Sequence, residues 1–248
     1  MNHKLTSVSA IILAAGRGTR MKAKNKNKVT FNLGGRPMIS YSVDNLHSAG
    51  INQIIVVVGF QAESVRAALK DTVTYATQSQ ALGTGDAVKV ALPYVASFTD
   101  TVLTVYGDDS AFYPPSLYQE MINKLHSTAS DLLVLTIHKD DPFGLGRIVR
   151  DEQNKIVKIV EEKVATAAEK QIKEINTGFY CFNKLFLIEH IDKIQQNPVS
   201  GEYYLTDLVE IALSHGKKVE ALFIPDGSIW HGVNNRSDYA RARAKLKV

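Results

Sequence analysis

The sequence predicts an α/β fold in which a mostly parallel sheet carries helices on both faces. Short apolar runs typical of strands alternate with helical patterns through the first half of the chain. Two of these runs, at residues 53–58 and 101–106, are apolar almost throughout. A near-continuous apolar run is typical of a strand that is buried on both sides of a parallel sheet.

The elements of the first half follow in order. Strands are predicted at residues 8–13, 53–58, 73–76 and 101–106, and helices at 61–69 and 85–92. A further helix starts after the first strand, because Pro37 suits the first turn of a helix, and it ends at Gly50. This alternation favours a doubly wound sheet.

The second half has a different pattern. A strand at 132–138 is followed by two short strands, 147–150 and 156–160, on either side of the turn sequence Asp151-Glu152-Gln153-Asn154. Further elements are a strand at 175–182, helices at 185–195 and 205–215, a strand at 219–224, and a final helix that carries Arg241, Arg243, Lys245 and Lys247. We therefore expect an antiparallel or mixed portion inserted after the first four strands.

Composition limits the class of protein. With 248 residues, 45% hydrophobic and 22% charged, the chain has an ordinary globular composition, and we expect one domain over residues 1–248. A net charge of +4, with one basic stretch at Lys22, Lys24, Lys26 and Lys28, does not indicate a nucleic-acid partner. The sequence has neither an apolar run of membrane-spanning length nor a signal-peptide pattern, so we expect a cytoplasmic protein. The single cysteine, Cys181, is expected in the core.

The most informative local feature is the run Leu-Ala-Ala-Gly-Arg-Gly-Thr-Arg-Met at residues 13–21, directly after the first strand. Backbone N–H groups can approach phosphate oxygens closely only where side chains are absent, so this glycine turn is a candidate anion site. It matches neither the dinucleotide fingerprint nor the P-loop. A purely structural turn is the alternative.

Polar residues follow several of the other predicted strands, at the edge where open α/β sheets bind ligands. Asp108 could hold Mg²⁺ together with Asn234, or be an ordinary turn or capping residue. Gln78 and the Gly83-Thr84-Gly85 turn could contact a base, or simply open a helix. Glu161 and Asn176 could bind sugar hydroxyls, or be surface residues.

Taken together, these segments resemble the nucleotidyltransferases that activate sugar 1-phosphates. The chain is most similar to the N-acetylglucosamine-1-phosphate uridylyltransferase domain of the bacterial bifunctional enzymes that make UDP-N-acetylglucosamine. Besides the glycine turn, the matching blocks are Leu-Gly-Thr-Gly (82–85), Tyr-Gly-Asp (106–108), Asp-Asp-Pro-Phe-Gly-Leu-Gly-Arg-Ile (140–148), Ile-Val-Glu-Glu-Lys (159–163), Gln-Ile-Lys-Glu-Ile-Asn-Thr-Gly (171–178), Gly-Glu-Tyr-Tyr-Leu-Thr-Asp (201–207) and Gly-Val-Asn-Asn-Arg (232–236).

The resemblance implies a Rossmann-like, GT-A-type nucleotidyltransferase fold, with a nucleotide-binding half at 1–110 and a sugar-binding half at 111–248. It also implies transfer of a uridylyl group from UTP to N-acetylglucosamine 1-phosphate with Mg²⁺ as cofactor. The implied catalytic residues are Arg20, Lys28 and Asp108, and the implied metal ligands are Asp108 and Asn234. The implied nucleotide-binding residues are Leu13, Ala14, Ala15, Gly16, Gly18, Thr19, Gln78, Gly83 and Thr84. The implied substrate-binding residues are Tyr106, Gly107, Gly146, Glu161, Asn176, Thr177 and Asn234.

The sequence departs from the family pattern at three places. Asn27 stands where a proline usually precedes the lysine, Asp109 adds a carboxylate after Asp108, and Trp230-His231 stands where an acidic residue often precedes Gly-Val-Asn. The acetyltransferase half of the bifunctional enzyme has no counterpart, so neither acetyl transfer nor its trimer is expected. The alternatives are a nucleotidyltransferase using dTTP, CTP or GTP, or a hexose 1-phosphate, and a catalytically silent nucleotide-sugar-binding module. The sequence leaves open whether the chain forms a homo-oligomer.

Overall fold

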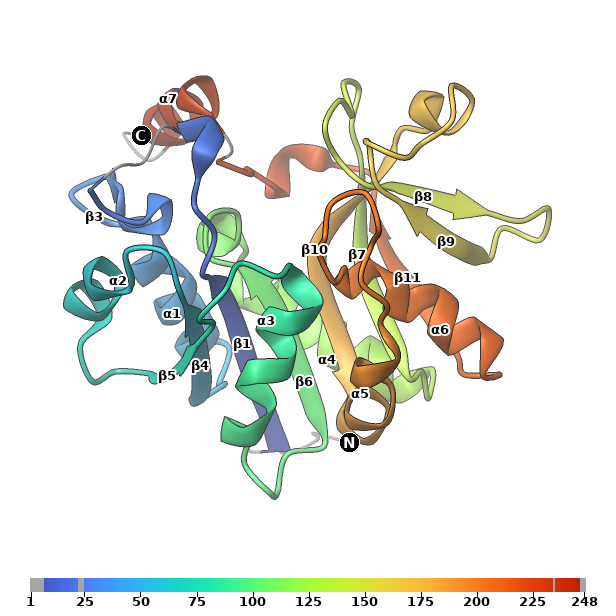
Figure 1. Ribbon diagram of the computed structural model, residues 1–248, viewed down its shortest axis with the longest axis horizontal. Coiled ribbons are helices and arrows are strands. Elements are labelled where there is room, and N and C mark those ends of the chain that lie inside the picture. Colours follow the sequence, from blue (N-terminus) through green and yellow to red (C-terminus); the bar gives the residue numbers. More distant parts are fainter. Residues whose placement is uncertain (1–6, 22–24, 234, 246–248) are drawn as a thin grey trace.

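The computed structural model describes residues 7–21, 25–233 and 235–245 and confirms the predicted α/β fold (Figure 1). Its strands are β1 (Val8–Ala14), β2 (Asn32–Leu33), β3 (Arg36–Pro37), β4 (Gln53–Val58), β5 (Thr74–Thr77), β6 (Thr101–Tyr106), β7 (Leu132–His138), β8 (Arg147–Arg150), β9 (Ile156–Val160), β10 (Glu174–Asn183) and β11 (Val219–Ile224). Its α-helices are α1 (Met38–Ser48), α2 (Ala62–Leu69), α3 (Thr84–Ala91), α4 (Pro115–Ser127), α5 (Lys184–His190), α6 (Leu208–Ser214) and α7 (Arg236–Lys245).

One nine-stranded sheet runs through both halves of the described chain, with its main strands in the order β11-β7-β10-β6-β1-β4-β5. The pairs β1–β4, β1–β6, β4–β5 and β7–β11 are parallel. The exception is β10, which lies antiparallel between β6 and β7. The amino end of β10 therefore reaches the same edge of the sheet as the carboxyl ends of β1 and β6.

Alternate residues of β1 pack into two separate cores, as expected for a sheet buried on both faces. Ile12 belongs to the core that includes side chains of α1, α2 and α4, whereas Ile11 belongs to the core that includes side chains of α3, α5 and α6. Figure 1 shows α3 and α5 in front of the sheet and α1 behind it. The predicted doubly wound arrangement is thus confirmed.

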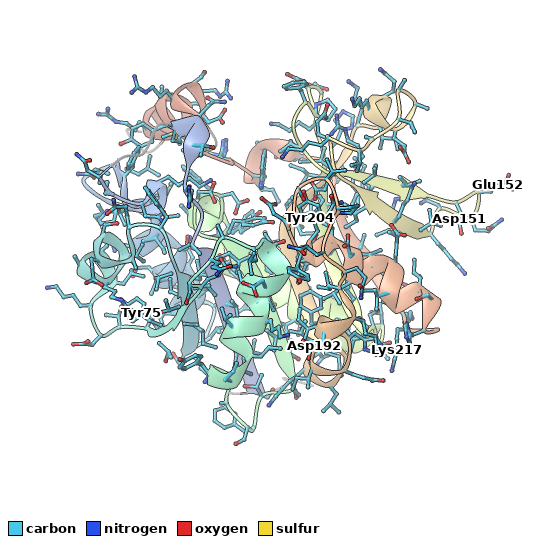
Figure 2. All side chains as sticks on the ribbon, viewed as in Figure 1. Tyr75, Asp151, Glu152, Asp192, Tyr204 and Lys217 are labelled. Atoms are coloured by element: carbon cyan, nitrogen blue, oxygen red, sulfur yellow. The ribbon has the colours of Figure 1, made fainter. Side chains whose placement is uncertain are left out.

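The inserted portion is a β8–β9 hairpin that pairs with β10 through β8. Asn154 has a positive φ of 61°, and the backbone N–H of Asp151 donates to the carbonyl of Lys155 (2.9 Å), so these residues form the predicted turn. Figure 2 shows Asp151 and Glu152 at the tip of the hairpin, projecting away from the sheet.

The helices differ from expectation at three places. The sequence-based expectations do not include α4, which begins at a Pro-Pro pair and buries Leu117, Met121 and Leu125 against the sheet. The helix predicted at 185–195 is shorter, because α5 ends at His190 and continues only as a 3₁₀ turn. Similarly, residues 205–207 form a 3₁₀ turn before α6 begins.

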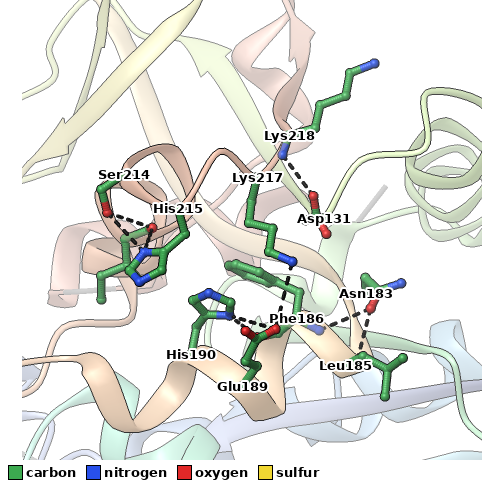
Figure 3. A network of polar contacts seen from close by, with 11 residues as sticks. Asp131, Asn183, Leu185, Phe186, Glu189, His190, Ser214, His215, Lys217 and Lys218 are labelled. Carbon is green, nitrogen blue, oxygen red and sulfur yellow. Dashed lines mark hydrogen bonds and ion pairs between the residues drawn. The ribbon is translucent and has the colours of Figure 1, made fainter.

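The edge of the sheet at the amino ends of β7 and β11 is held by a polar network (Figure 3). The side chain of Asn183 caps α5 by accepting from the backbone N–H of Leu185 (3.0 Å), and Asp131 accepts from the N–H of Lys218 (2.9 Å).

Cys181 is fully buried in β10, as predicted, and burial raises the pKa of its thiol well above the ordinary value. No helix in the described ranges is long and apolar enough to cross a membrane.

Candidate active site

A cleft of about 380 Å³ opens at the edge of the sheet where β1 and β6 end. Parallel strands bring loops that are distant in sequence to one edge, so the cleft gathers several of the predicted segments. The predicted site residues that line it are Leu13, Ala14, Ala15, Gly16, Gly18, Thr19, Lys28, Gln78, Gly83, Thr84, Tyr106 and Asp108.

The glycine turn forms one wall of this cleft. A Cβ added to Gly16 would meet no atom within 4 Å, so the backbone at this residue faces open space. Gly18 has a φ of +58°, a conformation that favours glycine, and its backbone packs against the aliphatic stem of Lys28. The turn therefore presents bare backbone to the cleft and supports a lysine behind it. Residue 20 lies in a short 3₁₀ helix, Thr19–Met21, but the side chain of Arg20 lies outside the described part of the structure.

The buried side chain of Asn27 holds the glycine turn in place through hydrogen bonds. It is almost fully buried, and its side-chain amide donates to the carbonyls of Ala14 (2.8 Å) and Phe60 (2.8 Å). Its side-chain oxygen accepts from the N–H of Val29 (3.1 Å) and so caps the 3₁₀ helix η3 (Lys28–Thr30). The φ of Asn27 is −65°, the value that proline fixes, but its backbone N–H donates to the hydroxyl of Ser64 (2.9 Å), a bond that a proline could not make.

Lys28 and Asp108 form an ion pair at the base of the cleft, between the ammonium Nζ and the carboxylate Oδ2. The Asp108 side chain is 9% exposed, so the pair is largely withdrawn from water. A buried carboxylate is costly without a counter-charge, and the lysine provides one. The resemblance-based expectation assigned these two residues to a triphosphate and a metal, and the structure brings them together.

The residues present fit a magnesium ion. The Asp108 carboxylate already holds a cation, in the form of the lysine ammonium. Within the described ranges no three acidic, histidine or cysteine side chains gather into a metal-binding cluster. Mg²⁺ is usually bound through one or two protein carboxylates together with substrate phosphates and water, and Asp108 offers such a carboxylate beside the glycine turn. The second predicted ligand, Asn234, lies outside the described residues.

Gln78 lies in the opposite wall, 6% exposed. Its amide nitrogen donates to the carbonyl of Gly83 (3.0 Å) and to the carboxylate of Asp86 (2.8 Å). Both partners can only accept, so they fix the orientation of the amide and use both of its hydrogens. Only the side-chain oxygen of Gln78 is left for a ligand, as an acceptor.

Another predicted block supports this wall. Tyr203, in the Gly-Glu-Tyr-Tyr-Leu-Thr-Asp segment, donates its N–H to the carbonyl of Leu82 (2.7 Å) and accepts from the N–H of Gly85 (2.8 Å). Gly83 has a φ of +100°, and a Cβ there would lie 2.5 Å from the carbonyl oxygen of Tyr203. Two motifs that are far apart in sequence thus dock by backbone pairing, which requires glycine at residue 83. Figure 2 labels the adjacent Tyr204 in this loop, in front of the sheet.

The predicted sugar residues gather beside Tyr106. The N–H of Asn176 donates to the carbonyl of Gly146 (2.9 Å), and a Cβ on Gly146 would lie 3.6 Å from a carboxylate oxygen of Glu161. Burial first, and then Asp207 and Glu202, raise the pKa of Glu161. The pKa of Tyr106 is also raised, first by burial and then by Glu161. The tyrosine therefore stays a neutral phenol that joins the nucleotide cleft to this group.

Two predicted substrate residues have structural partners instead. The hydroxyl of Thr177 donates to the carbonyl of Leu135 (2.9 Å) and accepts from the N–H of Phe179 (3.2 Å). Gly107 packs against Val29, Ile12 and Ile39 below the cleft. Neither residue lines the cleft at the glycine turn, and their role in substrate binding stays a prediction.

The two downstream departures from the family pattern contact each other. The indole N–H of Trp230 donates to Oδ2 of Asp109 (3.1 Å), and both residues are buried. The loop after β11 makes a second contact with the loop after β6, because the N–H of Val233 donates to the carbonyl of Asp108 (3.2 Å). Burial and the neighbouring Asp108 raise the pKa of Asp109 well above its ordinary range. The Asp109–Trp230 pair therefore links the loop after β6 to the loop after β11.

Sequence reasoning missed several residues of the cleft. Arg17, Asn27 and Glu202 also line it. Arg17 stands inside the glycine turn and Glu202 inside a matched block, so both could have been predicted from their positions in these motifs. Asn27 was noted only as the residue that replaces the proline usual in the family, because its buried role depends on the carbonyl of Phe60 in a distant loop.

The chain is similar to known proteins over almost its whole length. The family model described as "Nucleotidyl transferase" matches residues 9–247. The bifunctional protein GlmU of Exiguobacterium sibiricum is 41% identical over 247 residues, which is 100% of this chain and 54% of that protein. GlmU of Carboxydothermus hydrogenoformans is 42% identical over 94% of this chain and 52% of its own length. The chain thus spans about half the length of these relatives.

A solved structure has the same fold. It is described as a glucose-1-phosphate thymidylyltransferase from Bacillus anthracis in complex with sucrose. The match has a TM-score of 0.81 and covers 97% of this chain and 95% of that one, at 22% identity. This similarity extends over both the nucleotide-binding and the sugar-binding halves expected from the sequence.

Proposed function

Because this chain belongs to the nucleotidyl transferase family, we propose that it transfers a uridylyl group from UTP to N-acetylglucosamine 1-phosphate, giving the UDP-sugar and pyrophosphate. The observation that carries the proposal is the single cleft that gathers the bare glycine turn, Lys28, Gln78 and Asp108. Its wall at Tyr106 adjoins the group formed by Gly146, Glu161 and Asn176, where the sugar would lie.

Gln78 supports a base that carries a ring N–H. Since both amide hydrogens are used within the protein, the side chain can accept a hydrogen bond but not donate one. Uracil and thymine present an N–H at ring position 3, whereas cytosine presents an acceptor there. The geometry therefore favours UTP or dTTP over CTP.

The chemistry requires positioning of anions more than proton transfer. A sugar phosphate oxygen is already an anion, so it can attack the α-phosphorus of the nucleotide without a general base, with pyrophosphate leaving in line. Lys28 and the backbone N–H groups of the glycine turn would offset the charge of the phosphates, and Arg20 would add a second cation. Asp108 with Asn234 would hold Mg²⁺, which when bound supplies positive charge to the phosphate oxygens.

The sugar end is supported by residue chemistry. A carboxylate and an amide side by side, Glu161 and Asn176, can accept from and donate to sugar hydroxyls and an acetamido group. The side-chain oxygen of Asn176 accepts from the backbone N–H of Gly178 (2.9 Å), which fixes the orientation of the amide, and its nitrogen donates to the hydroxyl of Tyr180 (2.6 Å). The Glu-Ile-Asn-Thr-Gly and Glu-Tyr-Tyr-Leu-Thr-Asp blocks point to the N-acetylated sugar.

The test is a pyrophosphate-release assay with UTP, dTTP, CTP and GTP, each with several sugar 1-phosphates. We expect the fastest turnover with UTP and N-acetylglucosamine 1-phosphate. Asp108→Ala should lower turnover by about 10²–10³-fold or more while the unfolding transition stays cooperative. Activity confined to CTP, or near-normal turnover of the variant, would contradict the proposal.

A thymidylyltransferase is the second candidate, because the acceptor oxygen of Gln78 suits thymine equally well. The same assay separates the two activities, since dTTP would then exceed UTP in kcat/KM. Binding of UTP and UDP-N-acetylglucosamine without pyrophosphate release from any pair would instead indicate a binding module.

A further inference from the structure

The Lys28–Asp108 ion pair joins two groups that the reaction would use separately. In the proposed function, Asp108 holds the metal and Lys28 contacts phosphate, yet the structure places the ammonium directly on the carboxylate. Among the described residues that line the cleft, the cations are Arg17 and Lys28, and the carboxylates are Asp108 and Glu202. The lysine is therefore the counter-charge of the Asp108 carboxylate.

The pair is sheltered enough for this competition to matter. The exposed fractions of the two side chains are 18% for Lys28 and 9% for Asp108, and such partly buried charges are screened less than surface ones. The stem of Lys28 is held against Gly18, and the start of η3 is fixed by Asn27. The ammonium is thus directed toward Asp108 by the fold and does not reach it as a freely rotating surface group.

We infer that Lys28 takes the place of the metal on Asp108 until a nucleotide binds, so that the site excludes free divalent ions and accepts them only as a complex with the nucleotide. This inference rests on the proposed function. A free ion must displace the ammonium from Asp108 and leave it without a partner. A metal–nucleotide complex brings phosphate oxygens that take over the ammonium, so both ions are paired after the exchange.

The exchange makes metal and nucleotide binding cooperative. If the nucleotide raises the affinity for metal by some factor, the metal raises the affinity for nucleotide by the same factor. Removing the lysine charge should weaken this coupling. It should also strengthen metal binding in the absence of nucleotide, although it weakens catalysis. A residue that only binds phosphate would have no such effect on the metal alone.

The experiment measures Mn²⁺ binding to the full chain without nucleotide, by the loss of the electron paramagnetic resonance signal of free Mn²⁺. The variant Lys28→Met keeps the aliphatic stem that packs on Gly18 and removes the charge. Lys28→Arg keeps the charge. Lys26→Met is the matched control, because Lys26 is exposed and lies over the ring of Phe31 instead (5.0 Å). Each protein is then measured again with a non-hydrolysable UTP analogue.

We expect Lys28→Met to bind Mn²⁺ about tenfold more tightly than the unmodified chain, which corresponds to about 1.4 kcal/mol. Lys26→Met and Lys28→Arg should match the unmodified chain, and the analogue should raise Mn²⁺ affinity less in Lys28→Met than in the others. Equal Mn²⁺ affinity in all four proteins, or equal tightening by Lys26→Met, would overturn the inference. Neither result depends on which nucleotide is turned over, so a failure of the proposed function shows separately in the pyrophosphate assay.

Discussion

Asn27→Ala removes the side-chain hydrogen bonds that hold the glycine turn to its surroundings. The Asn27 amide bridges the carbonyls of Ala14 and Phe60, and its oxygen caps η3 at the N–H of Val29. Alanine leaves both carbonyls and the N–H without these partners in a place where water has little access. The change therefore tests whether this buried asparagine positions Lys28.

The expected cost follows from these bonds. A buried intramolecular hydrogen bond contributes about 1 kcal/mol net, so the loss of the three shorter bonds, without the long contact to the carbonyl of Gly16 (3.4 Å), predicts about 3 kcal/mol of destabilisation. For a chain of 248 residues this lowers the melting temperature by about 6–12 °C. The variant also loses the cap of η3, the 3₁₀ helix that carries Lys28, so the ammonium is less well positioned. The KM for the nucleotide should therefore rise even where the variant remains folded.

The assay is denaturant unfolding followed by the fluorescence of Trp230, the only tryptophan, together with steady-state kinetics at 20 °C. The control is Asn45→Ala, because Asn45 donates a single bond, to the carbonyl of Ala111 (3.1 Å). It should cost about 1 kcal/mol and leave the KM unchanged. If Asn27→Ala costs no more than this control and its KM is unaltered, the assigned role of Asn27 is wrong.

Three further predictions concern other contacts. Gly178→Ala should destabilise by more than about 2 kcal/mol in denaturant unfolding, because its Cβ would lie 1.9 Å from the ring of Tyr106, whereas Gly216→Ala, with a similar φ but open space, should cost about 1 kcal/mol. A double-mutant cycle of Asp109→Val and Trp230→Phe should give a coupling energy of about 1–2 kcal/mol, and strict additivity would show that the bond contributes nothing. Burial, followed by Glu210, raises the pKa of Asp207 to about 6, so the folded protein binds a proton at Asp207 more tightly than the unfolded chain does. The resulting stabilisation is fully present below about pH 4 and falls as the pH rises to 6. This pH dependence of the melting temperature should be missing in Asp207→Asn.

The sequence predicted the sheet well because its strands are strongly apolar. Runs such as 8–13 and 53–58 are buried on both faces, so local composition alone identified them. The helix α4 was harder, because exposed residues such as Gln119 and Glu120 interrupt the apolar positions that pack on the sheet. The antiparallel direction of β10 was left open as a mixed portion, since strand direction is decided by pairing between residues far apart in the chain.

Site residues could be predicted from the sequence where they form a local motif. They could not be predicted where their role depends on contacts with residues far apart in the chain. The glycine turn and Asp108 follow their strands directly, so position alone placed them at the ligand edge. Asp109 and Trp230 were noted separately as departures, but nothing in the sequence indicated that they contact each other. The hydroxyl of Thr177 donates to the carbonyl of Leu135 in β7, a contact that only the fold reveals, and its role at the sugar stays a prediction.

The reversed strand β10 also bears on how the chain reaches this structure during synthesis. When β6 leaves the ribosome, its outer edge has no partner, because β10 is made only after α4, β7, β8 and β9. An unpaired apolar strand edge is prone to associate with other chains. We therefore expect a nascent chain arrested after β6 to need chaperone protection, and a protein cut near residue 110 to recover solubility only when both fragments are present together.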